Sequence, residues 1–397
     1  MSVEITENGE VHIYGRERLS DRPRIAMLTS GGDCPGLNAV IRAATKTGFW
    51  LGYDVIGFRD GFEGLIDPIR YQVLSPRNTA GILVQGGTIL GSTNKGRFAA
   101  RVGVSGRAEL EPELIKKVAA TIERLKIEGL IVVGGDGSLS TALQFHEAGI
   151  PVVGVPKTID NDLDSTAYTF GFNSAVLCCA DALDRLHTTA ESHRRVMVLE
   201  VMGRHTGWIA LHGGIAGGAD VILIPEIEWN YENILAKIEE RRQLDKGFTL
   251  IVVAEGARLP SGLMVIDEAG SQNKQIRLGG IGHVISEHLA TMINQEVRCV
   301  VLGHLQRGGG PTTFDRVLAS EYGAHAVRLV VEKRFGQMVC SDPPNICDVP
   351  IAEAVDQIRW IDPTSSSVQT ARAMGICFGD TPGYSNPFRT GEDEKSG

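Results

Sequence analysis

Short apolar runs that end in glycine-rich or acidic clusters constrain the fold of this chain more than any other feature. Each run is followed by a stretch of helical length. Unbroken apolar strands that alternate with helices are typical of parallel sheets covered on both faces. Ligands of such sheets bind beyond the carboxyl ends of the strands, which is where the clusters lie. The runs comprise residues 25–28, 129–133, 151–155, 196–201, 249–254 and 298–302.

The composition narrows the possible partners. The 397 residues carry a formal net charge of -9 at pH 7. An acidic chain is poorly suited to bind nucleic acid or an anionic membrane surface, so we expect neither partner. The cysteines include no Cys-x-x-Cys pair, and the adjacent Cys178 and Cys179 are typical of core residues. Residues 1–22 lack an apolar segment, so we expect a cytoplasmic protein.

Two glycine-rich clusters follow predicted strands and have the composition of phosphate-binding loops. Residues 31–36 precede a predicted helix, whose N-terminus can bind phosphate, although an ordinary turn explains this cluster equally well. Residues 134–138, Gly-Gly-Asp-Gly-Ser, are more informative. Three glycines leave room for a polyphosphate, and Asp136 can hold Mg²⁺. The alternative for this cluster is a structural turn.

Residues 158–162, Thr-Ile-Asp-Asn-Asp, close the next predicted strand. If the backbone stays extended, Asp160 and Asp162 point to the same side. One carboxylate can then accept a hydroxyl proton while the other contacts metal-bound water or the substrate. Lys157 adds a cation beside the same group. The alternative is an acidic solvated loop, but the segment leads directly out of a buried strand.

Basic side chains gather in three clusters later in the chain. Arg195 precedes a predicted strand, Arg204 follows that strand, and Arg307 follows another in His-Leu-Gln-Arg-Gly-Gly-Gly. An arginine beside a turn suits bidentate capture of a phosphate. A surface salt bridge explains any one of these arginines alone. Together with the acidic clusters they indicate a site for a phosphorylated substrate.

The motifs exclude the P-loop and protein-kinase types of phosphoryl-transfer site and resemble those of another kinase family. The chain has no GxxxxGK[ST] loop and no HRD or DFG motif. It resembles the 6-phosphofructokinase family over roughly residues 24–380, and TIDND together with HLQRGG is highly specific. NAD and lipid kinases share GGDG but lack MGR and HLQRGG. The matching segments are residues 29–33, 134–138, 156–162, 202–204 and 303–309.

The resemblance implies a fold. We expect two similar three-layer α/β domains with mainly parallel central sheets, as in phosphofructokinases. Residues 24–171 with 306–357 would form the donor-binding domain, and residues 172–305 with 358–380 the sugar-phosphate domain. Residues 1–23 are expected to be a polar extension and residues 381–397 a disordered tail.

The resemblance also implies an activity, the transfer of a phosphoryl group from Mg-ATP to the 1-hydroxyl of fructose 6-phosphate in glycolysis. Asp160 resembles the general base, assisted by Lys157, and Asp136 resembles the magnesium ligand. Arg195 and Arg298 resemble the pair that reaches the 6-phosphate from a neighbouring subunit, which implies a homotetramer or dimer with shared active sites. The donor residues would be Gly32, Lys95, Asp136, Gly137 and Ser138. The other sugar contacts would be Thr158, Asp160, Asp162, Met202, Gly203, Arg204, Glu255, His304 and Arg307.

Two positions bear on the phosphoryl donor, and they disagree. Gly137 stands where pyrophosphate-dependent members carry Asp, whose carboxylate would occupy the space and charge of the ATP α-phosphate. Lys157 stands where those members have Lys and many bacterial ATP-dependent members have Gly. The glycine is the stronger discriminator because sterics and charge act together. We therefore expect ATP as the donor, with pyrophosphate as the alternative.

Some positions depart from the family's pattern. Lys95 or Arg97 would replace an arginine that ATP-dependent members often carry, and Thr141 replaces a glycine beside the adenosine. A third interpretation is a non-catalytic paralogue that binds sugar phosphate and regulates a sister subunit. Such a protein would be expected to lose Asp160 or Asp136, and both are present.

Overall fold

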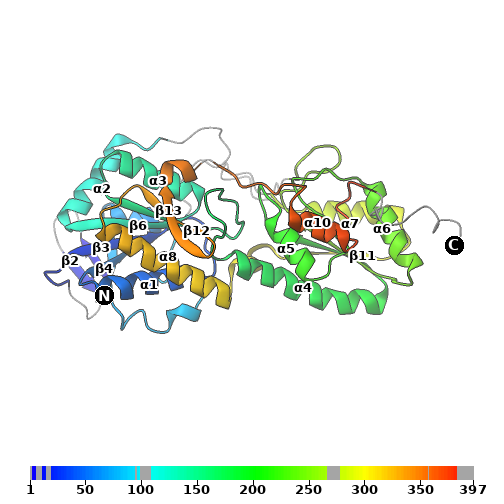
Figure 1. The fold of residues 1–397 in the computed structure, drawn as a ribbon, viewed down its shortest axis with the longest axis horizontal. Coiled ribbons are helices and arrows are strands. Elements are labelled where there is room, and N and C mark those ends of the chain that lie inside the picture. Colours follow the sequence, from blue (N-terminus) through cyan, green and yellow to red (C-terminus); the bar gives the residue numbers. More distant parts are fainter. Residues whose placement is uncertain are drawn as a thin grey trace. The chain divides into compact units, whose positions relative to one another are not determined.

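The chain divides into two compact units (Figure 1). The computed structural model describes residues 2–5, 11–14, 19–93, 96–98, 109–265, 278–355 and 357–381. The first unit comprises Met1–Ser174 and Arg307–Ile358, and the second comprises Ala175–Gln306 and Arg359–Gly397. The chain passes between the units after residues 174, 306 and 358, and the expected crossings were after residues 171, 305 and 357.

The first unit is built on a sheet of nine strands within the described residues. The central strands β12, β7, β6, β3 and β4 are parallel. Antiparallel strands flank them on both sides. In sheet order the strands are β13 (Asn345–Pro350), β12 (Gln337–Asp342), β7 (Val152–Pro156), β6 (Ile127–Gly134), β3 (Arg24–Thr29), β4 (Asp54–Phe58), β5 (Ile69–Leu74), β1 (Ser2–Ile5) and β2 (Val11–Tyr14).

The segment expected to be a polar N-terminal extension contributes two of these strands. Strand β1 pairs with β5, and β2 pairs with β1, so both lengthen the sheet at one side. Without them β5 would present unpaired backbone N–H and C=O groups at the edge of the sheet. The start of the chain is therefore part of the first unit's fold, which corrects the expectation of a simple extension.

Helices cover both faces of the first sheet. Leu130 and Val132 of β6 lie in one core cluster with Val118 of α2 and Phe145 of α3. Ile131 points to the opposite face, because successive side chains of a strand alternate. On that face α1 and α8 pack against each other and against the strands. The elements of these layers are α1 (Leu37–Trp50), η1 (Gly61–Leu65), η2 (Ile82–Val84), α2 (Pro112–Arg124), α3 (Asp136–Glu147), α8 (Thr313–Val331) and α9 (Ile351–Ala354).

The second unit has a smaller sheet of four parallel strands within the described residues, in the order β11 (Val297–Val301), β8 (Val196–Val201), β10 (Thr249–Ala254) and β9 (Val221–Leu223). One face packs in a core cluster with α6 (Tyr231–Gln243) and α7 (Ile281–Met292). The strands β9 and β10 also contact α5 (Trp208–Ala216), which packs against α4 (Phe172–His193). Both units are thus layered α/β structures with mainly parallel sheets. The predicted fold class is confirmed, although the two sheets differ in size.

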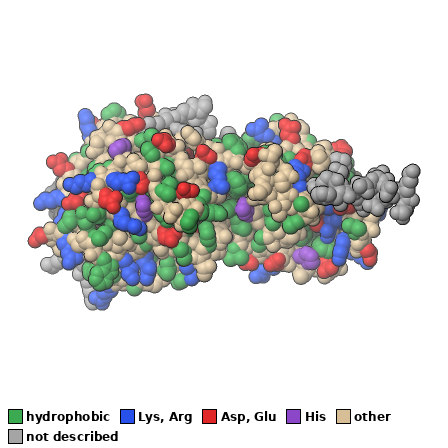
Figure 2. Space-filling model, viewed as in Figure 1, with side chains coloured by type: hydrophobic (Ala, Val, Ile, Leu, Met, Phe, Trp, Pro, Cys, Tyr) green, Lys and Arg blue, Asp and Glu red, His purple; other side chains and the backbone are tan. Residues whose placement is uncertain are grey.

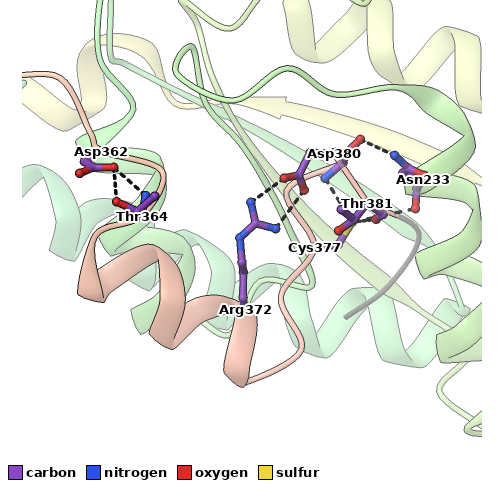
Figure 3. Close-up of polar contacts among 8 residues, drawn as sticks. Asn233, Asp362, Thr364, Arg372, Cys377, Asp380 and Thr381 are labelled. Atoms are coloured by element: carbon purple, nitrogen blue, oxygen red, sulfur yellow. Dashed lines mark hydrogen bonds and ion pairs between the residues drawn. The ribbon is translucent and has the colours of Figure 1, made fainter. Parts of the chain in front are cut away.

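Hydrogen bonds hold the last described residues of the second unit in place (Figure 3). Helix α10 (Ser366–Ala373) packs on α5, and Arg372 near its end donates two hydrogen bonds to the carboxylate of Asp380, at 3.0 and 2.6 Å. The side-chain amide of Asn233 donates to the carbonyl oxygen of Gly379, at 2.9 Å. Residues 382–397, which make up nearly all of the expected disordered tail, lie outside the described residues.

The surface carries charges of both signs. Acidic and basic side chains are interspersed on the face drawn in Figure 2. Among the described helices, none has the length and apolar character that a membrane span requires.

Candidate active site

Three of the predicted clusters meet at one edge of the first sheet. They follow β7, β6 and β3, which are neighbouring parallel strands, so their carboxyl ends lie side by side. Two backbone hydrogen bonds join the loops where they leave the strands. The N–H of Ser30 donates to the carbonyl oxygen of Val133, and the N–H of Lys157 donates to that of Gly134, both at 2.9 Å. The structure therefore brings the loop after β3 to loops that lie more than a hundred residues further along the chain.

Lys157 is the buried cation of this edge. It is 4% exposed, and its Nζ donates a hydrogen bond to the carbonyl oxygen of Gly32, at 2.5 Å. Burial lowers the pKa of Lys157, while the negative charge of nearby groups, Asp160 and Asp33 among them, opposes the shift. A buried amine in such surroundings favours the arrival of an anion, because the anion offsets the charge that burial disfavours.

The Thr-Ile-Asp-Asn-Asp segment bends, so the condition of an extended backbone is not met. Asn161 has a φ of 52°, in the left-handed region that Asn tolerates better than most residues. The N–H of Asp160 donates to the hydroxyl of Thr158 at 3.1 Å. The alternation rule for strands therefore does not place Asp160 and Asp162 on one side. Both carboxylates nevertheless lie partly buried in the same turn.

A buried amide holds this turn in place. Asn161 is 2% exposed, and its Oδ1 accepts hydrogen bonds from the N–H and the hydroxyl of Thr169, at 2.9 and 3.2 Å. The same hydroxyl donates to the carbonyl oxygen of Thr158, at 2.7 Å. Asn161 was not among the predicted site residues. The signal that could have indicated it is an amide between two acids, since Asn is favoured at left-handed positions.

A close contact requires glycine at position 134, and the flexible side chain of Arg307 lies against Gly32. A Cβ at Gly134 would lie 2.3 Å from Cβ of Ser138, and a Cβ at Gly32 would lie 2.9 Å from Nη1 of Arg307. The same Nη1 donates to the carbonyl oxygen of Asp33 at 3.1 Å. Arg307, expected as a sugar contact, therefore lies against the loop that contains Gly32, a predicted donor residue. Small residues here let backbone and guanidinium approach a phosphate together.

The start of α3 supplies the remaining predicted donor residues. Asp136 is the first residue of the helix and is exposed, and Gly137 and Ser138 follow it in the first turn. The N–H of Ser138 donates to the carbonyl oxygen of Gly135 at 3.0 Å, and the N–H groups that precede it at a helix N-terminus favour anions. Within the described ranges no group of three or more His, Cys, Asp or Glu side chains is arranged to hold a metal ion. A single carboxylate beside a phosphate loop fits Mg²⁺, which proteins usually hold through one or two carboxylates and the substrate's phosphates.

The positions that depart from the family's pattern are only partly described. Lys95 lies outside the described residues. Arg97 forms an ion pair with Glu63, with 3.0 Å between Nη2 and Oε2, so its guanidinium is engaged within the first unit. Thr141 is buried, and its hydroxyl donates to the carbonyl oxygen of Gly137 at 3.2 Å. Its polar atom is thus satisfied within α3.

The second unit gathers most of the predicted sugar contacts at the carboxyl ends of its strands. Met202, Gly203 and Arg204 follow β8, and Glu255 follows β10. The N–H of Glu255 donates to the carbonyl oxygen of Val201 at 2.9 Å, which joins these two loops. His304 is exposed in η4 (Gly303–Arg307), directly after β11. These residues share one edge of the sheet because β11, β8 and β10 are parallel neighbours.

Arg195 and Arg298 lie toward the opposite edge of the same sheet. Arg195 immediately precedes β8, and Arg298 is paired with Met197 near the start of that strand. Strand β8 has six residues, and a strand rises about 3.3 Å per residue, so about 20 Å of strand separates Arg195 from the Met202 loop. The structure therefore does not bring these two arginines together with the other sugar residues of the same chain.

Gln306 is a further residue that the sequence interpretation passed over. It is 1% exposed, and its Oε1 accepts a hydrogen bond from the N–H of Met202, at 2.7 Å. Gln306 lies inside the His-Leu-Gln-Arg-Gly-Gly motif, so the motif itself was the signal. Its side chain ties that motif to the predicted sugar loop after β8.

Comparisons with known proteins find similarity over nearly the whole chain. The family model described as Phosphofructokinase matches residues 24–330. An ATP-dependent 6-phosphofructokinase of Chloroflexus aurantiacus is 51% identical over 361 residues, which cover 91% of this chain and 99% of the relative. A pyrophosphate–fructose 6-phosphate 1-phosphotransferase of Streptomyces coelicolor is 46% identical over 361 residues, 90% of this chain and 100% of that protein.

A solved structure shows the same fold. The crystal structure of Pichia pastoris phosphofructokinase in the T-state superposes with a TM-score of 0.73 at 30% sequence identity. The match covers 86% of this chain and 36% of that longer chain.

Proposed function

The chain belongs to the phosphofructokinase family, and on that premise we propose that it phosphorylates the 1-hydroxyl of fructose 6-phosphate with ATP, yielding fructose 1,6-bisphosphate. The observation that carries the proposal is the convergence of the loops after β3, β6 and β7, where Lys157 bonds Gly32 and Asp160 lies close enough to affect its charge. The 51% identity to a relative named ATP-dependent 6-phosphofructokinase supports the same activity. The reaction is a step of glycolysis, and we place it in the cytoplasm.

The residues of the first unit bind the donor and assist the transfer. The backbone of the Gly32 loop and the first turn of α3, with Gly137 and Ser138, hold the phosphates of ATP. Asp136 holds Mg²⁺, which when bound neutralises charge on the donor phosphates. Asp160 accepts the proton of the sugar 1-hydroxyl. Lys157 stabilises the charge that develops on the transferring group, as a preorganised cation in a dry site.

The residues of the second unit orient the sugar. Met202, Gly203, Arg204, Glu255 and His304 share one edge of its sheet and contact fructose 6-phosphate. The resemblance to the family assigns Thr158, Asp162 and Arg307 to the same substrate. Arg195 and Arg298 bind the 6-phosphate of a sugar in a neighbouring subunit. The length of β8 between the two groups supports this division, because one sugar phosphate is too small to span it. The enzyme is accordingly a homo-oligomer, a tetramer or a dimer, whose active sites are shared.

ATP is the donor in this proposal, and pyrophosphate is the alternative. Gly137 leaves the space and charge of the α-phosphate free, where a carboxylate would exclude it. Relatives named for each donor are found at 51% and 46% identity, so the choice depends on such positions as well as on overall similarity.

Turnover with each donor tests the assignment. Purified protein is assayed with fructose 6-phosphate and Mg²⁺, and with either ATP or pyrophosphate, by measuring fructose 1,6-bisphosphate. We expect kcat/KM to be at least about tenfold higher with ATP, which corresponds to about 1.4 kcal/mol. A preference for pyrophosphate would reverse the choice of donor. Binding of fructose 6-phosphate without turnover on either donor would instead indicate a non-catalytic, regulatory paralogue.

Replacing Gln306 with leucine should weaken sugar binding more than catalysis. The change leaves the N–H of Met202 without its acceptor, and an unsatisfied buried donor costs about 1–3 kcal/mol. We expect KM for fructose 6-phosphate to rise roughly tenfold, with kcat and KM for ATP changed less than about twofold. Steady-state kinetics with each substrate varied in turn provide the measurement.

The control for this variant is Gln243→Leu, which makes the same chemical change at an exposed position of α6. It should leave all kinetic constants unchanged. A lower apparent kcat with both KM values unchanged would point to partial unfolding, and equal rises in both KM values would contradict a specific role in positioning the sugar loop.

A further inference from the structure

Glu296 lies between the two arginines expected to bind the sugar 6-phosphate. Its Oε2 pairs with Nε of Arg195, and its Oε1 pairs with Nη2 of Arg298. The side chains of Arg195, Glu296 and Arg298 are 25%, 40% and 60% exposed, so solvent and solutes can reach the group. Hydrogen bonds from Arg195, reinforced by the positive charge of both arginines, lower the pKa of Glu296, which is therefore ionised at neutral pH.

The backbone keeps these three residues in register. The N–H of Val196 donates to the carbonyl oxygen of Glu296 at 3.0 Å, and β8 pairs with β11 directly beyond it. The side chain of Gln295 donates to the carbonyl oxygens of Arg194 and Gly247, at 3.1 and 2.8 Å. The positions at which β8 and β11 begin therefore place the carboxylate of Glu296 opposite the two guanidinium groups. Rotation of the Glu296 side chain is enough to move the carboxylate away from them.

The charges of Arg195, Glu296 and Arg298 are those expected if the carboxylate competes with a phosphate for the two arginines. Two guanidinium groups carry a charge of +2, which matches a phosphate monoester that carries about -1.5 to -2 at pH 7. With Glu296 in place the net charge is +1, and both oxygens of its carboxylate occupy N–H groups that a phosphate would use. A sugar phosphate that bound with the carboxylate still in place would meet a like charge within the same group.

We propose that Glu296 is a built-in counter-anion, which occupies Arg195 and Arg298 in place of a phosphate and must release them when a sugar 6-phosphate binds. This inference rests on the proposed function only for the identity of the ligand. Exposed ion pairs are weak, so the carboxylate can be displaced. The carboxylate of Glu296 lowers the affinity of the two arginines for every phosphate. Weakly charged anions do not displace it.

The experiment compares Glu296→Gln with the wild type in two separate measurements. Calorimetric titration with inorganic phosphate, in the absence of any donor, should show binding about three- to tenfold tighter in the variant. Steady-state kinetics should show KM for fructose 6-phosphate lower by a similar factor, with kcat changed less than about twofold. The control Glu239→Gln removes the same charge from an exposed pair with Arg242 on α6 and should change neither quantity.

A second pair of variants tests whether the effect of Glu296→Gln on phosphate binding comes from the arginines. In the variant Arg298→Ala, the further change Glu296→Gln should tighten phosphate binding by a smaller factor than it does in the wild type, because the carboxylate then blocks Arg195 alone. Weaker binding of phosphate or fructose 6-phosphate in Glu296→Gln would overturn the proposal and show that Glu296 orients the arginines instead. Lack of turnover with any donor would remove the proposed function, but the phosphate titration would still decide the role of Glu296.

Discussion

Replacing Asp160 with serine should lower kcat at least about 10²-fold, the range typical of a lost general base. Serine is smaller and does not accept a proton at neutral pH, so the 1-hydroxyl would have to attack without assistance. The turn itself should persist, because the N–H of Asp160 bonds to Thr158 and the buried amide of Asn161 holds the loop. The measurement is kcat at saturating ATP and fructose 6-phosphate, with thermal unfolding to verify the fold.

The matched control for this variant is Asp164→Ser, which changes an exposed aspartate four residues further along the same loop. It should retain wild-type turnover and stability. Near-normal kcat in Asp160→Ser would exclude Asp160 as the base. A large loss in both variants would show only that the loop tolerates no change.

Replacing Lys157 with methionine should lower kcat about 10²- to 10³-fold while leaving the protein folded. The loss follows from removing a preorganised cation from the site where charge develops. Burial lowers the pKa of Lys157, so the charged amine is disfavoured in the folded protein and the apolar side chain relieves that cost. The lost hydrogen bond to Gly32 opposes this gain, so we expect the melting temperature to change little.

The pH dependence of stability separates these effects. Because the folded-state pKa of Lys157 lies below the unfolded value of about 10.4, the wild type gains stability as pH rises from the former to the latter. Lys157→Met should lack this gain, whereas Lys116→Met, which removes an exposed lysine of α2, should retain it. Unfolding curves between neutral and alkaline pH provide the measurement. Wild-type kcat in Lys157→Met would contradict the catalytic role.

The local sequence was sufficient to locate the loops of the candidate site. An apolar run of strand length followed by Gly-Gly-Asp or Thr-Ile-Asp indicates a buried strand that ends in a loop. This inference needs only the few residues of the segment itself, because they influence their own φ, ψ and burial. The placement of Lys157 beside Gly32 follows from β7, β6 and β3 being neighbours. Their order in the sheet was not read from any segment alone, although the resemblance to a known family implied it.

Other features depended on partners outside the segment itself. Strands β1 and β2 form because β5 offers an open edge, and a polar segment with weak local preference gives no sign of that edge. The left-handed turn at Asn161 depends on Thr169, which supplies the donors for its amide. The inference that Asp160 and Asp162 point to the same side was conditional on an extended backbone, and the structure shows that the backbone bends here.

The residue types and their spacing, with the family resemblance that they carry, predicted the chemistry: carboxylates, a lysine and glycine loops at strand ends, and arginines for a phosphate. Only the tertiary structure decided how these groups are divided, with Met202 and Glu255 at one end of the second sheet and Arg195 and Arg298 toward the other, facing Glu296. The physical reason is that a side chain's identity is local, whereas its neighbours are set by strand order and register, which many distant contacts determine together.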